Sequence, residues 1–271
     1  MRTTKELNMT RDLKFGVEIE FINRECVADV IRIAESKGVV VKELRYTHDV
    51  TNGFWKIVTD SSCGMEIVSP VLYGMEGIEE VKKVCEALNE AGAKVNVNCG
   101  VHVHHDLKGI GAEQLKNVYR FYDKYIKAID SMMPNSRRGN NNCYCQDTPL
   151  YVMNYLDECN TFDDILEIVA DISSKRYRKI NLVSARKYGT IEFRQHSGST
   201  DGEKITNWII LTNLILQRAE GKAVKPVTEA RKRKWAESDV EMMYDFYMEL
   251  GISGTALAKY VRSRRKALKN D

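Results

Sequence analysis

The feature that most constrains the fold is a short stretch in which charged and apolar residues alternate. Residues 15–21, FGVEIEF, place Glu18 and Glu20 two positions apart within an otherwise apolar run. Side chains two residues apart on a β-strand point to the same face, so both carboxylates share one face and the apolar residues share the other. Such a row indicates either a solvated strand face or a cation held between the carboxylates.

Two later stretches repeat this alternation. Each places polar or charged side chains two residues apart: His102 and His104 within CGVHVHHD, residues 99–106, and Glu192, Arg194 and His196 within TIEFRQHSGSTD, residues 190–201. The positions between them are mostly apolar. We therefore expect three strands of one sheet that share a polar face and bury the opposite face under helices.

Periodicity elsewhere predicts an α+β fold. Several neighbouring strand-like runs are joined by short polar links, which favours an antiparallel sheet with helices on one side. The predicted strands are residues 14–22, 39–44, 54–58, 65–69, 94–98, 100–106, 180–184 and 189–196. The predicted helices are residues 26–37, 77–91, 115–129, 162–172, 202–218, 239–250 and 253–268.

The composition is typical of a protein from a reduced compartment. Hydrophobic residues make up 43% of the 271 residues, which is enough for a sizeable core. The seven cysteines are an odd number and are scattered along the chain. We find no signal-peptide pattern, and no apolar run approaches the roughly 18 residues of a membrane span. We therefore expect a cytoplasmic protein with free thiols and no membrane partner.

A boundary is predicted at KAVKP, residues 222–226, between a domain of residues 1–221 and a basic tail of residues 222–271. The tail holds 12 Lys/Arg and 7 Asp/Glu, so its net charge is +5, whereas the whole chain carries +3. Its two predicted helices are joined by GISGT, residues 251–255, and resemble a helix-turn-helix. Two interpretations stay open: a helical hairpin packed on the main domain, or a surface that binds nucleic acid.

The predicted polar face carries the ligands of a hard divalent cation. Glu18, Glu20 and Glu192 would repel one another in a low dielectric, and they can relieve this repulsion by protonation or by binding cations. Carboxylates with one imidazole suit Mg²⁺ or Mn²⁺, and Glu66 in MEIVSP is a further candidate ligand. Arg194 adds a positive charge where phosphate oxygens could lie. The combination indicates metal-assisted phosphoryl transfer.

Each motif also has a structural alternative. A Glu-x-Glu pair is commonly a solvated strand face, a His-x-His pair is commonly structural, and Glu-x-Arg commonly forms cross-strand ion pairs. The sequence contains neither a P-loop nor a Gly-x-Gly-x-x-Gly turn after a strand, so a nucleotide would have to bind without those phosphate cradles.

Taken in this order, the motifs resemble the amidoligase family of the glutamine synthetase and glutamate–cysteine ligase superfamily. Four stretches carry the resemblance across about residues 13–215: FGVEIEF, DSSCGMEIVSP, CGVHVHHD and GTIEFRQHSGSTDGEKITNW. The resemblance implies a curved antiparallel sheet with the glutamine synthetase-like fold and helices packed behind it. It also implies an enzyme that uses ATP and Mg²⁺ (or Mn²⁺) to join a carboxylate to an amine through an acyl phosphate.

The resemblance further implies a role for each site residue. Glu20 and Glu66 would hold one metal, and Glu18, His102 and Glu192 would hold a second that bridges the nucleotide phosphates. Arg194 matches the arginine that stabilises the transferred phosphoryl group, so the implied catalytic residues are Glu20, Glu192 and Arg194. His104 and Asp60 match less closely, as groups that contact ATP or substrate.

A polar loop, residues 134–149, is a candidate lid, because the amine must attack before water does. Arg137 and Arg138 in this loop are candidates to bind ATP phosphate or a substrate carboxylate, and a solvated basic loop is the alternative. The chain is far shorter than glutamine synthetase, so the acceptor stays open among a peptide, a protein and a small amine. Two other functions also stay open: nucleic-acid binding through the tail, and an ATP-dependent kinase on the same sheet.

Overall fold

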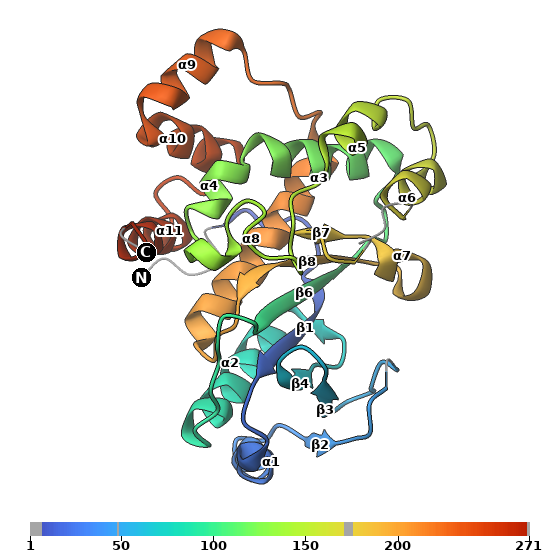
Figure 1. Ribbon diagram of the computed structural model, residues 1–271, viewed down its shortest axis with the longest axis vertical. Helices are drawn as coiled ribbons and strands as arrows, with labels where there is room; N and C mark the ends of the chain where they lie inside the picture. The colour runs from blue at the N-terminus through green and yellow to red at the C-terminus, as the bar shows by residue number, and fades with distance from the viewer. Residues whose placement is uncertain (1–6, 48, 171–175, 270–271) are drawn as a thin grey trace. The chain divides into compact units, whose positions relative to one another are not determined.

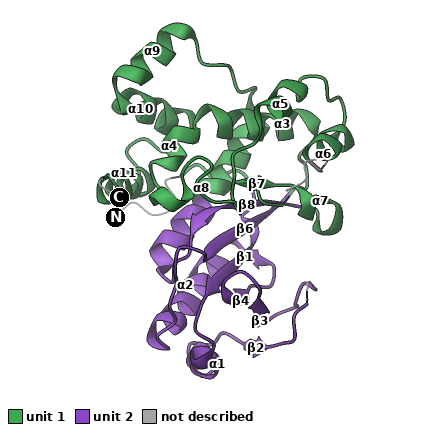
Figure 2. Cartoon of the chain, in the orientation of Figure 1, with its two compact units in different colours: residues 1–11, 107–189, 211–271 green, residues 12–106, 190–210 purple. Residues whose placement is uncertain are grey.

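The computed structural model describes residues 7–47, 49–170 and 176–269, and the chain divides into two compact units (Figures 1 and 2). Unit 1 comprises residues 1–11, 107–189 and 211–271, and unit 2 comprises residues 12–106 and 190–210. All three alternating stretches lie within unit 2 or begin its second segment, so unit 2 holds the predicted polar face.

Unit 2 is a β-sheet with helices against it (Figure 1). Its strands are β1 (Lys14–Phe21), β2 (Val41–Glu43), β3 (Trp55–Asp60), β4 (Gly64–Val68), β5 (Leu72–Tyr73), β6 (Gly100–Asp106) and β8 (Thr190–Ser197). Its helices are α1 (Val27–Ser36), α2 (Gly74–Glu90) and the first half of α8 (Gly202–Gly221). The strands pair in the order β2-β3-β4-β1-β6-β8, and β5 pairs with β1.

The sheet agrees with the expected α+β class but is not purely antiparallel. Every one of these strand pairs is antiparallel except β2 with β3, which run parallel. The departure lies at the edge of the sheet. The central strands β4, β1, β6 and β8, which carry the predicted site, keep the expected antiparallel pairing.

The apolar face of β1 packs against α2. Its side chains are at most 2% exposed: Phe15, Val17, Ile19 and Phe21. A Cβ added at Gly77 of α2 would lie 3.3 Å from two ring atoms of Phe15, so the helix backbone approaches this strand closely. Trp55 of β3 also donates from Nε1 to the Glu80 carboxylate of α2 at 2.7 Å. Burial of this face supplies the hydrophobic free energy that fixes the strands beneath the polar face.

A β-bulge in β8 corrects the prediction for His196. Val103 of β6 pairs with Phe193, but Val101 pairs with His196, so one extra residue of β8 lies between these pairs. Because a bulge shifts the alternation by one residue, His196 turns to the apolar face and its ring lies 5.8 Å from that of Trp208 in α8. Glu192 and Arg194, before the bulge, stay on the polar face.

One predicted strand is wrong, and another is confirmed only in part. Residues 94–98 form no strand, and Val97 is 69% exposed; instead, the Asn96 side chain accepts from the backbone N–H groups of Asn98 and Cys99. Such a turn competes with strand pairing. The predicted strand at 180–184 is only β7 (Ile180–Asn181), and α7 (Val183–Tyr188) follows it.

Unit 1 is mainly helical. Besides β7, α7 and the second half of α8, it contains α3 (Ala112–Lys124), α4 (Ile126–Asp130), α5 (Leu150–Tyr155), α6 (Phe162–Ala170), α9 (Glu229–Glu237), α10 (Asp239–Glu249) and α11 (Ala256–Ala267). The sequence did not predict α5 or α9. Residues 171 and 172 of the helix predicted to end at 172 lie outside the described residues. The boundary predicted between residues 221 and 222 stays a prediction.

The tail helices pack within unit 1. The Glu249 carboxylate of α10 accepts from Lys124 at 2.7 Å, Tyr125 at 2.6 Å and Arg218 at 2.8 Å. The Tyr125 ring also lies 5.5 Å from the ring of Trp235 in α9. This packing agrees with the interpretation of the tail as a packed helical hairpin. If the tail also binds nucleic acid, it must do so through the side chains that stay exposed. Among the described helices of both units, none has the length and apolar character needed to cross a membrane.

Gly198 offers a test of the close packing beside β8. Its N–H donates to the Cys99 carbonyl at 2.7 Å, and an added Cβ would overlap the Cβ of Cys99. We expect Gly198→Ala to lower the free energy of unfolding by about 1–3 kcal/mol, the usual cost of overpacking, in urea denaturation. As a control, Gly221→Ala adds a Cβ that meets nothing within 4 Å and should change it by less than about 1 kcal/mol. Equal losses in both variants would contradict the packing described here.

Candidate functional site

The strand register brings the predicted ligands into neighbouring rows on the polar face. Glu18 of β1 pairs with His102 of β6, and Glu20 of β1 pairs with Glu66 of β4. Glu192 of β8 pairs with His104 of β6. Four adjacent strands therefore contribute to one surface (Figure 1), and each ligand is placed by a backbone ladder rather than by a loop.

One cluster consists of Glu18, His102 and Glu192. The Nδ1 atom of His102 lies 3.1 Å from a Glu18 oxygen and 3.6 Å from a Glu192 oxygen. One ligand atom from each of the three residues lies within 4.8 Å of the others, which is close enough for a single ion to bind all three. The side chains of His102 and Glu192 are almost fully buried, whereas that of Glu18 is about one quarter exposed at 27%.

A second cluster consists of Glu20, Glu66 and His102. Its ligand atoms also lie within 4.8 Å of one another, and His102 Nε2 lies 3.7 Å from a Glu20 oxygen. The other Glu20 oxygen accepts from the Gly100 N–H at 2.5 Å. His102 therefore stands between the two clusters, with Nδ1 toward one and Nε2 toward the other.

His104 supplies positive charge beside these clusters. Its Nε2 lies 3.3 Å from a Glu18 oxygen, and its Nδ1 lies 3.3 Å from Thr190 Oγ1. Burial by itself would lower the pKa of His104, but the negative charges of Glu192 and Glu18 outweigh it, so the pKa is raised. A histidine that tends to stay protonated balances carboxylates better than it binds a metal.

Glu66 is a carboxyl group whose ionisation the site disfavours. Burial raises the pKa of Glu66 well above its usual value, and the charges of Glu18 and Glu20 add to this effect. Burial also acts on Glu18 and Glu192, but nearby histidines hold the pKa of Glu18 down, and Arg194 together with the histidines lowers that of Glu192. A divalent cation in this cluster would favour the ionised form of Glu66.

Arg194 is positioned by Glu192. Its Nη1 atom donates to a Glu192 oxygen, and its side chain keeps 13% of its surface exposed. The charges of Glu192 and Glu18 overcome the effect of burial and raise the pKa of Arg194, so the guanidinium stays charged. A fixed guanidinium at the rim of a carboxylate cluster is placed to contact an anionic ligand as well.

Asp60 has local structural contacts. Its Oδ1 accepts from the Ser62 N–H at 2.7 Å and from the Cys63 N–H at 3.1 Å, which closes the turn between β3 and β4. Asp60 also belongs to a third group of potential ligands with Glu20 and Cys63. Its predicted contact with ATP or substrate stays a prediction.

Arg137 and Arg138 lie in unit 1 and contact the protein. Arg137 is 2% exposed, and its Nη1 lies 3.7 Å from Cys145 Sγ. Arg138 donates from Nε to the Met133 carbonyl and from Nη2 to the Leu268 carbonyl, both at 2.8 Å. These contacts order the loop at 134–149. Phosphate binding by the two arginines and the lid stay predictions.

Two residues near the polar face were not predicted. Lys56 of β3 pairs with Val68, which pairs with Glu18, so Lys56 lies in the same row; it is 4% exposed and donates to the Thr47 and Asp49 carbonyls. Cys63 lies in the β3–β4 turn. The position of Lys56 inside the apolar run WKIV could have indicated a buried lysine near the site. Nothing in the sequence distinguished Cys63 from the other cysteines.

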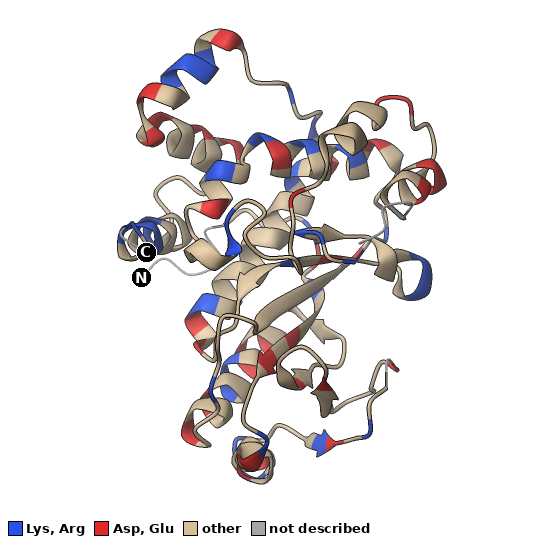
Figure 3. Ribbon diagram, in the orientation of Figure 1, with Lys and Arg blue, Asp and Glu red and all other residues tan. Residues whose placement is uncertain are grey.

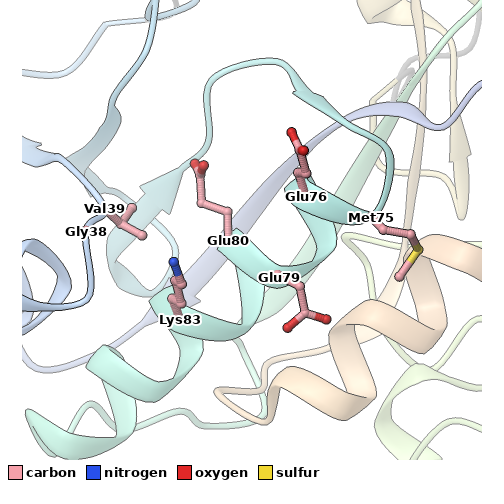
Figure 4. A pocket seen from close by; sticks show the side chains of 7 residues that line it. All are labelled: Gly38, Val39, Met75, Glu76, Glu79, Glu80 and Lys83. Atoms are coloured by element: carbon pink, nitrogen blue, oxygen red, sulfur yellow. The ribbon is translucent and has the colours of Figure 1, made fainter.

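A pocket of about 430 Å³ lies elsewhere in unit 2, between the end of α1 and the start of α2 (Figure 4). Its charged lining residues are Glu76, Glu79, Glu80 and Lys83. Among the described residues, none of those predicted for the site lines this pocket. It is therefore separate from the carboxylate clusters.

Comparison with known proteins agrees with the four-motif resemblance. A family model described as "Putative amidoligase enzyme" matches residues 11–216, from β1 into α8. A search among curated proteins gave no match. The matched region contains both carboxylate clusters, together with Arg194 and His104. Because it spans far more than half of the 271 residues, the chain belongs to this amidoligase family.

Proposed function

We propose that the chain is an ATP- and Mg²⁺-dependent carboxylate–amine ligase that forms an amide or isopeptide bond through an acyl phosphate. The observation that carries the proposal is the pair of carboxylate clusters on either side of His102, with Arg194 at their rim, within a region that belongs to an amidoligase family. The family supports a ligase that takes a carboxylate and an amine. The nucleotide, the metal and the mechanism are our proposals.

The donor atoms fit Mg²⁺ or Mn²⁺. Both clusters are built from carboxylates and one imidazole, which are ligands that these ions accept. Following the family resemblance, Glu20 and Glu66 would hold one ion, and Glu18, His102 and Glu192 would hold the other. When bound, these ions would neutralise nucleotide phosphates and the charge that develops during phosphoryl transfer.

The protein's own residues supply positioning and charge. Arg194, fixed by Glu192, would bind an oxygen of the transferred phosphoryl group. His104, held near Glu18, would keep a proton on Nε2 and so limit repulsion among the carboxylates and phosphates. Mutual positioning by four strands suits a reaction in which most of the catalysis is orientation and charge neutralisation.

We further propose that the sheet of unit 2 is the curved, glutamine synthetase-like catalytic sheet that the family resemblance implies. Its central antiparallel strands and polar face support this proposal. The amine acceptor would be a peptide, a protein or a small amine. A cytoplasmic location is also proposed, since all seven cysteines are free and a reduced compartment suits such thiols.

The first test is calorimetric titration of Mg²⁺ and a non-hydrolysable ATP analogue into wild type and Glu192→Gln. We expect saturable binding to wild type and at least about tenfold weaker binding to the variant. Loss of an outer partner of a metal site already costs about 10–100-fold in affinity, and loss of a direct ligand such as Glu192 should cost no less. Glu203→Gln, an exposed carboxylate on α8, is the control and should bind like wild type. Unchanged affinity in Glu192→Gln would show that the nucleotide site is misplaced.

A second test uses the raised pKa of Glu66. A carboxyl group whose folded-state pKa is raised stabilises the fold below its usual pKa, near 4.5, and this contribution is lost as pH rises through the folded value. Glu66→Gln stays neutral, so it should raise the Tm of the metal-free protein at pH about 8, by roughly 2–4 °C for each kcal/mol gained.

The same variant should also respond less to metal. Mg²⁺ should raise the Tm of wild type more than that of Glu66→Gln, because only the wild type keeps the full carboxylate set. Thermal scans at two pH values, with chelator and with Mg²⁺, measure both effects. A variant that is less stable than wild type without metal at pH about 8 would mean that protein partners already stabilise the Glu66 charge.

Nucleic-acid binding by the tail is a second candidate function, and the surface of α11 favours it. Four basic residues on α11 and just after it are exposed: Lys259, Arg262, Lys266 and Lys269. Figure 3 shows the basic residues gathered on this helix. No acidic residue occurs among the described residues from 251 to 269. Such a helix face matches the charge of a phosphate backbone.

The salt dependence of duplex DNA binding tests this second function. We expect replacement of Lys259, Arg262 and Lys266 by Gln to reduce the slope of log affinity against log salt by about 2–3, since each phosphate contact contributes about 0.9. A control that replaces three exposed basic residues elsewhere, Lys83, Lys94 and Arg186, should leave the slope unchanged. An unchanged slope in the α11 variant would exclude this surface as a DNA-binding site.

The third candidate function is an ATP-dependent kinase on the same sheet. Release of ADP with a phosphorylated acceptor, but without formation of an amide, would indicate this kinase activity instead of a ligase.

A further inference from the structure

The turn between β3 and β4 brings a thiol to the edge of the carboxylate face. Glu20, Asp60 and Cys63 each offer a ligand atom, and these atoms lie within 4.8 Å of one another. The Cys63 Sγ lies 3.4 Å from Asp60 Oδ1. We propose that these three residues form a binding site for a thiophilic divalent cation such as Zn²⁺, which is distinct from the Mg²⁺ sites proposed above but shares Glu20 with one of them.

The geometry suits an ion with few protein ligands. Zn²⁺ in reactive sites is commonly held by three protein ligands, with one position left for water or another group. Glu20 is 5% exposed and Cys63 is 9% exposed, so the donors are desolvated before the ion arrives. Asp60 is held in place by the N–H groups of Ser62 and Cys63, which fixes one carboxylate of the site.

The ligand set separates this site chemically from the neighbouring clusters. A thiolate favours Zn²⁺ and Cd²⁺, whereas Mg²⁺ prefers oxygen ligands and keeps much of its water. The clusters around His102 contain carboxylates and imidazole without sulfur. The two kinds of site therefore select different ions, although they lie on one sheet and have Glu20 in common.

A second thiol, that of Cys99, lies beside Cys63 but outside the group of three ligands. The hydrogen bond with the Cys99 side chain, burial and the charges of Glu20 and Asp60 all raise the pKa of the Cys63 thiol, so a cation would bind there by displacing the thiol proton. Cys99 is fully buried, and its Sγ also lies 3.5 Å from Asn96 Oδ1. Cys99 immediately precedes Gly100, whose N–H donates to Glu20. Hydrogen bonds to outer partners orient the ligands of metal sites, and Cys99 and Gly100 would do so here for the thiol and the carboxylate.

Sharing of Glu20 has a consequence that rests on the proposed ligase function. An ion bound by Cys63 and Glu20 would make the Glu20 carboxylate less available to the metal site that it forms with Glu66 and His102. Zn²⁺ would then lower the affinity for Mg²⁺–nucleotide and inhibit the ligase. The existence of the thiol site does not depend on that reaction.

The test is a titration of the full-length protein with Cd²⁺, without nucleotide, followed by the ultraviolet charge-transfer absorbance of thiolate-bound Cd²⁺. We expect one saturable band in wild type and its loss in Cys63→Ser. Cys143→Ser, which removes an exposed cysteine, is the matched control and should keep the band. Asp60→Asn and Glu20→Gln should weaken Cd²⁺ binding by more than the roughly 10–100-fold that loss of an outer partner costs, whereas Glu192→Gln should not.

Three results would overturn the proposal: no band in wild type, a band that persists in Cys63→Ser, or full affinity in both Asp60→Asn and Glu20→Gln. Asp60→Asn keeps every thiol, so it tests the site even if Cys63→Ser does not fold. Failure of the ligase proposal is recognised separately, by the nucleotide titration of Glu192→Gln. A Cd²⁺ site that depends on Cys63 and Asp60 would stand in either case.

Discussion

Repulsion among buried carboxylates is the constraint on which the rest of unit 2 depends. Four glutamates from three strands lie on one face of the sheet, and their charges are only partly balanced by His104 and Arg194. The cost of this arrangement appears at Glu66, whose pKa is raised by burial and by its neighbours. Hydrophobic burial on the opposite face of the sheet must therefore offset an unfavourable polar face. Functional sites commonly carry such a cost.

A β-sheet suits a crowded group of carboxylates because strands hold side chains more rigidly than loops do. Backbone ladders fix the Cα positions of Glu18, His102 and Glu192, which limits how far these side chains can move apart. The close contact of Gly198 with Cys99 fixes the start of β6, and the next residue, Gly100, donates to Glu20. Preorganised ligands are what orientation-based catalysis requires.

How far the sequence could predict the site depended on the kind of signal that each residue carried. Glu18, Glu20, His102 and Glu192 were readable because alternation places side chains on a known face. His196 was misplaced because a bulge leaves no mark in the alternation, and residues 94–98 were misread because Asn96 closes a turn instead of joining a ladder. The grouping of Cys63 with Glu20 depends on how a turn folds against a distant strand, which local patterns do not contain.

His102 and Glu20 make the three ligand groups dependent on one another. His102 directs Nδ1 to Glu18, at 3.1 Å, and Nε2 to Glu20, at 3.7 Å. A neutral imidazole has one lone pair and one N–H, so it can bind a metal in one cluster only while it donates to a carboxylate of the other. Glu20 has two oxygens but belongs to two groups of potential ligands and already accepts from Gly100. A cation bound in one group would therefore change the ligands that remain for a cation in the next group.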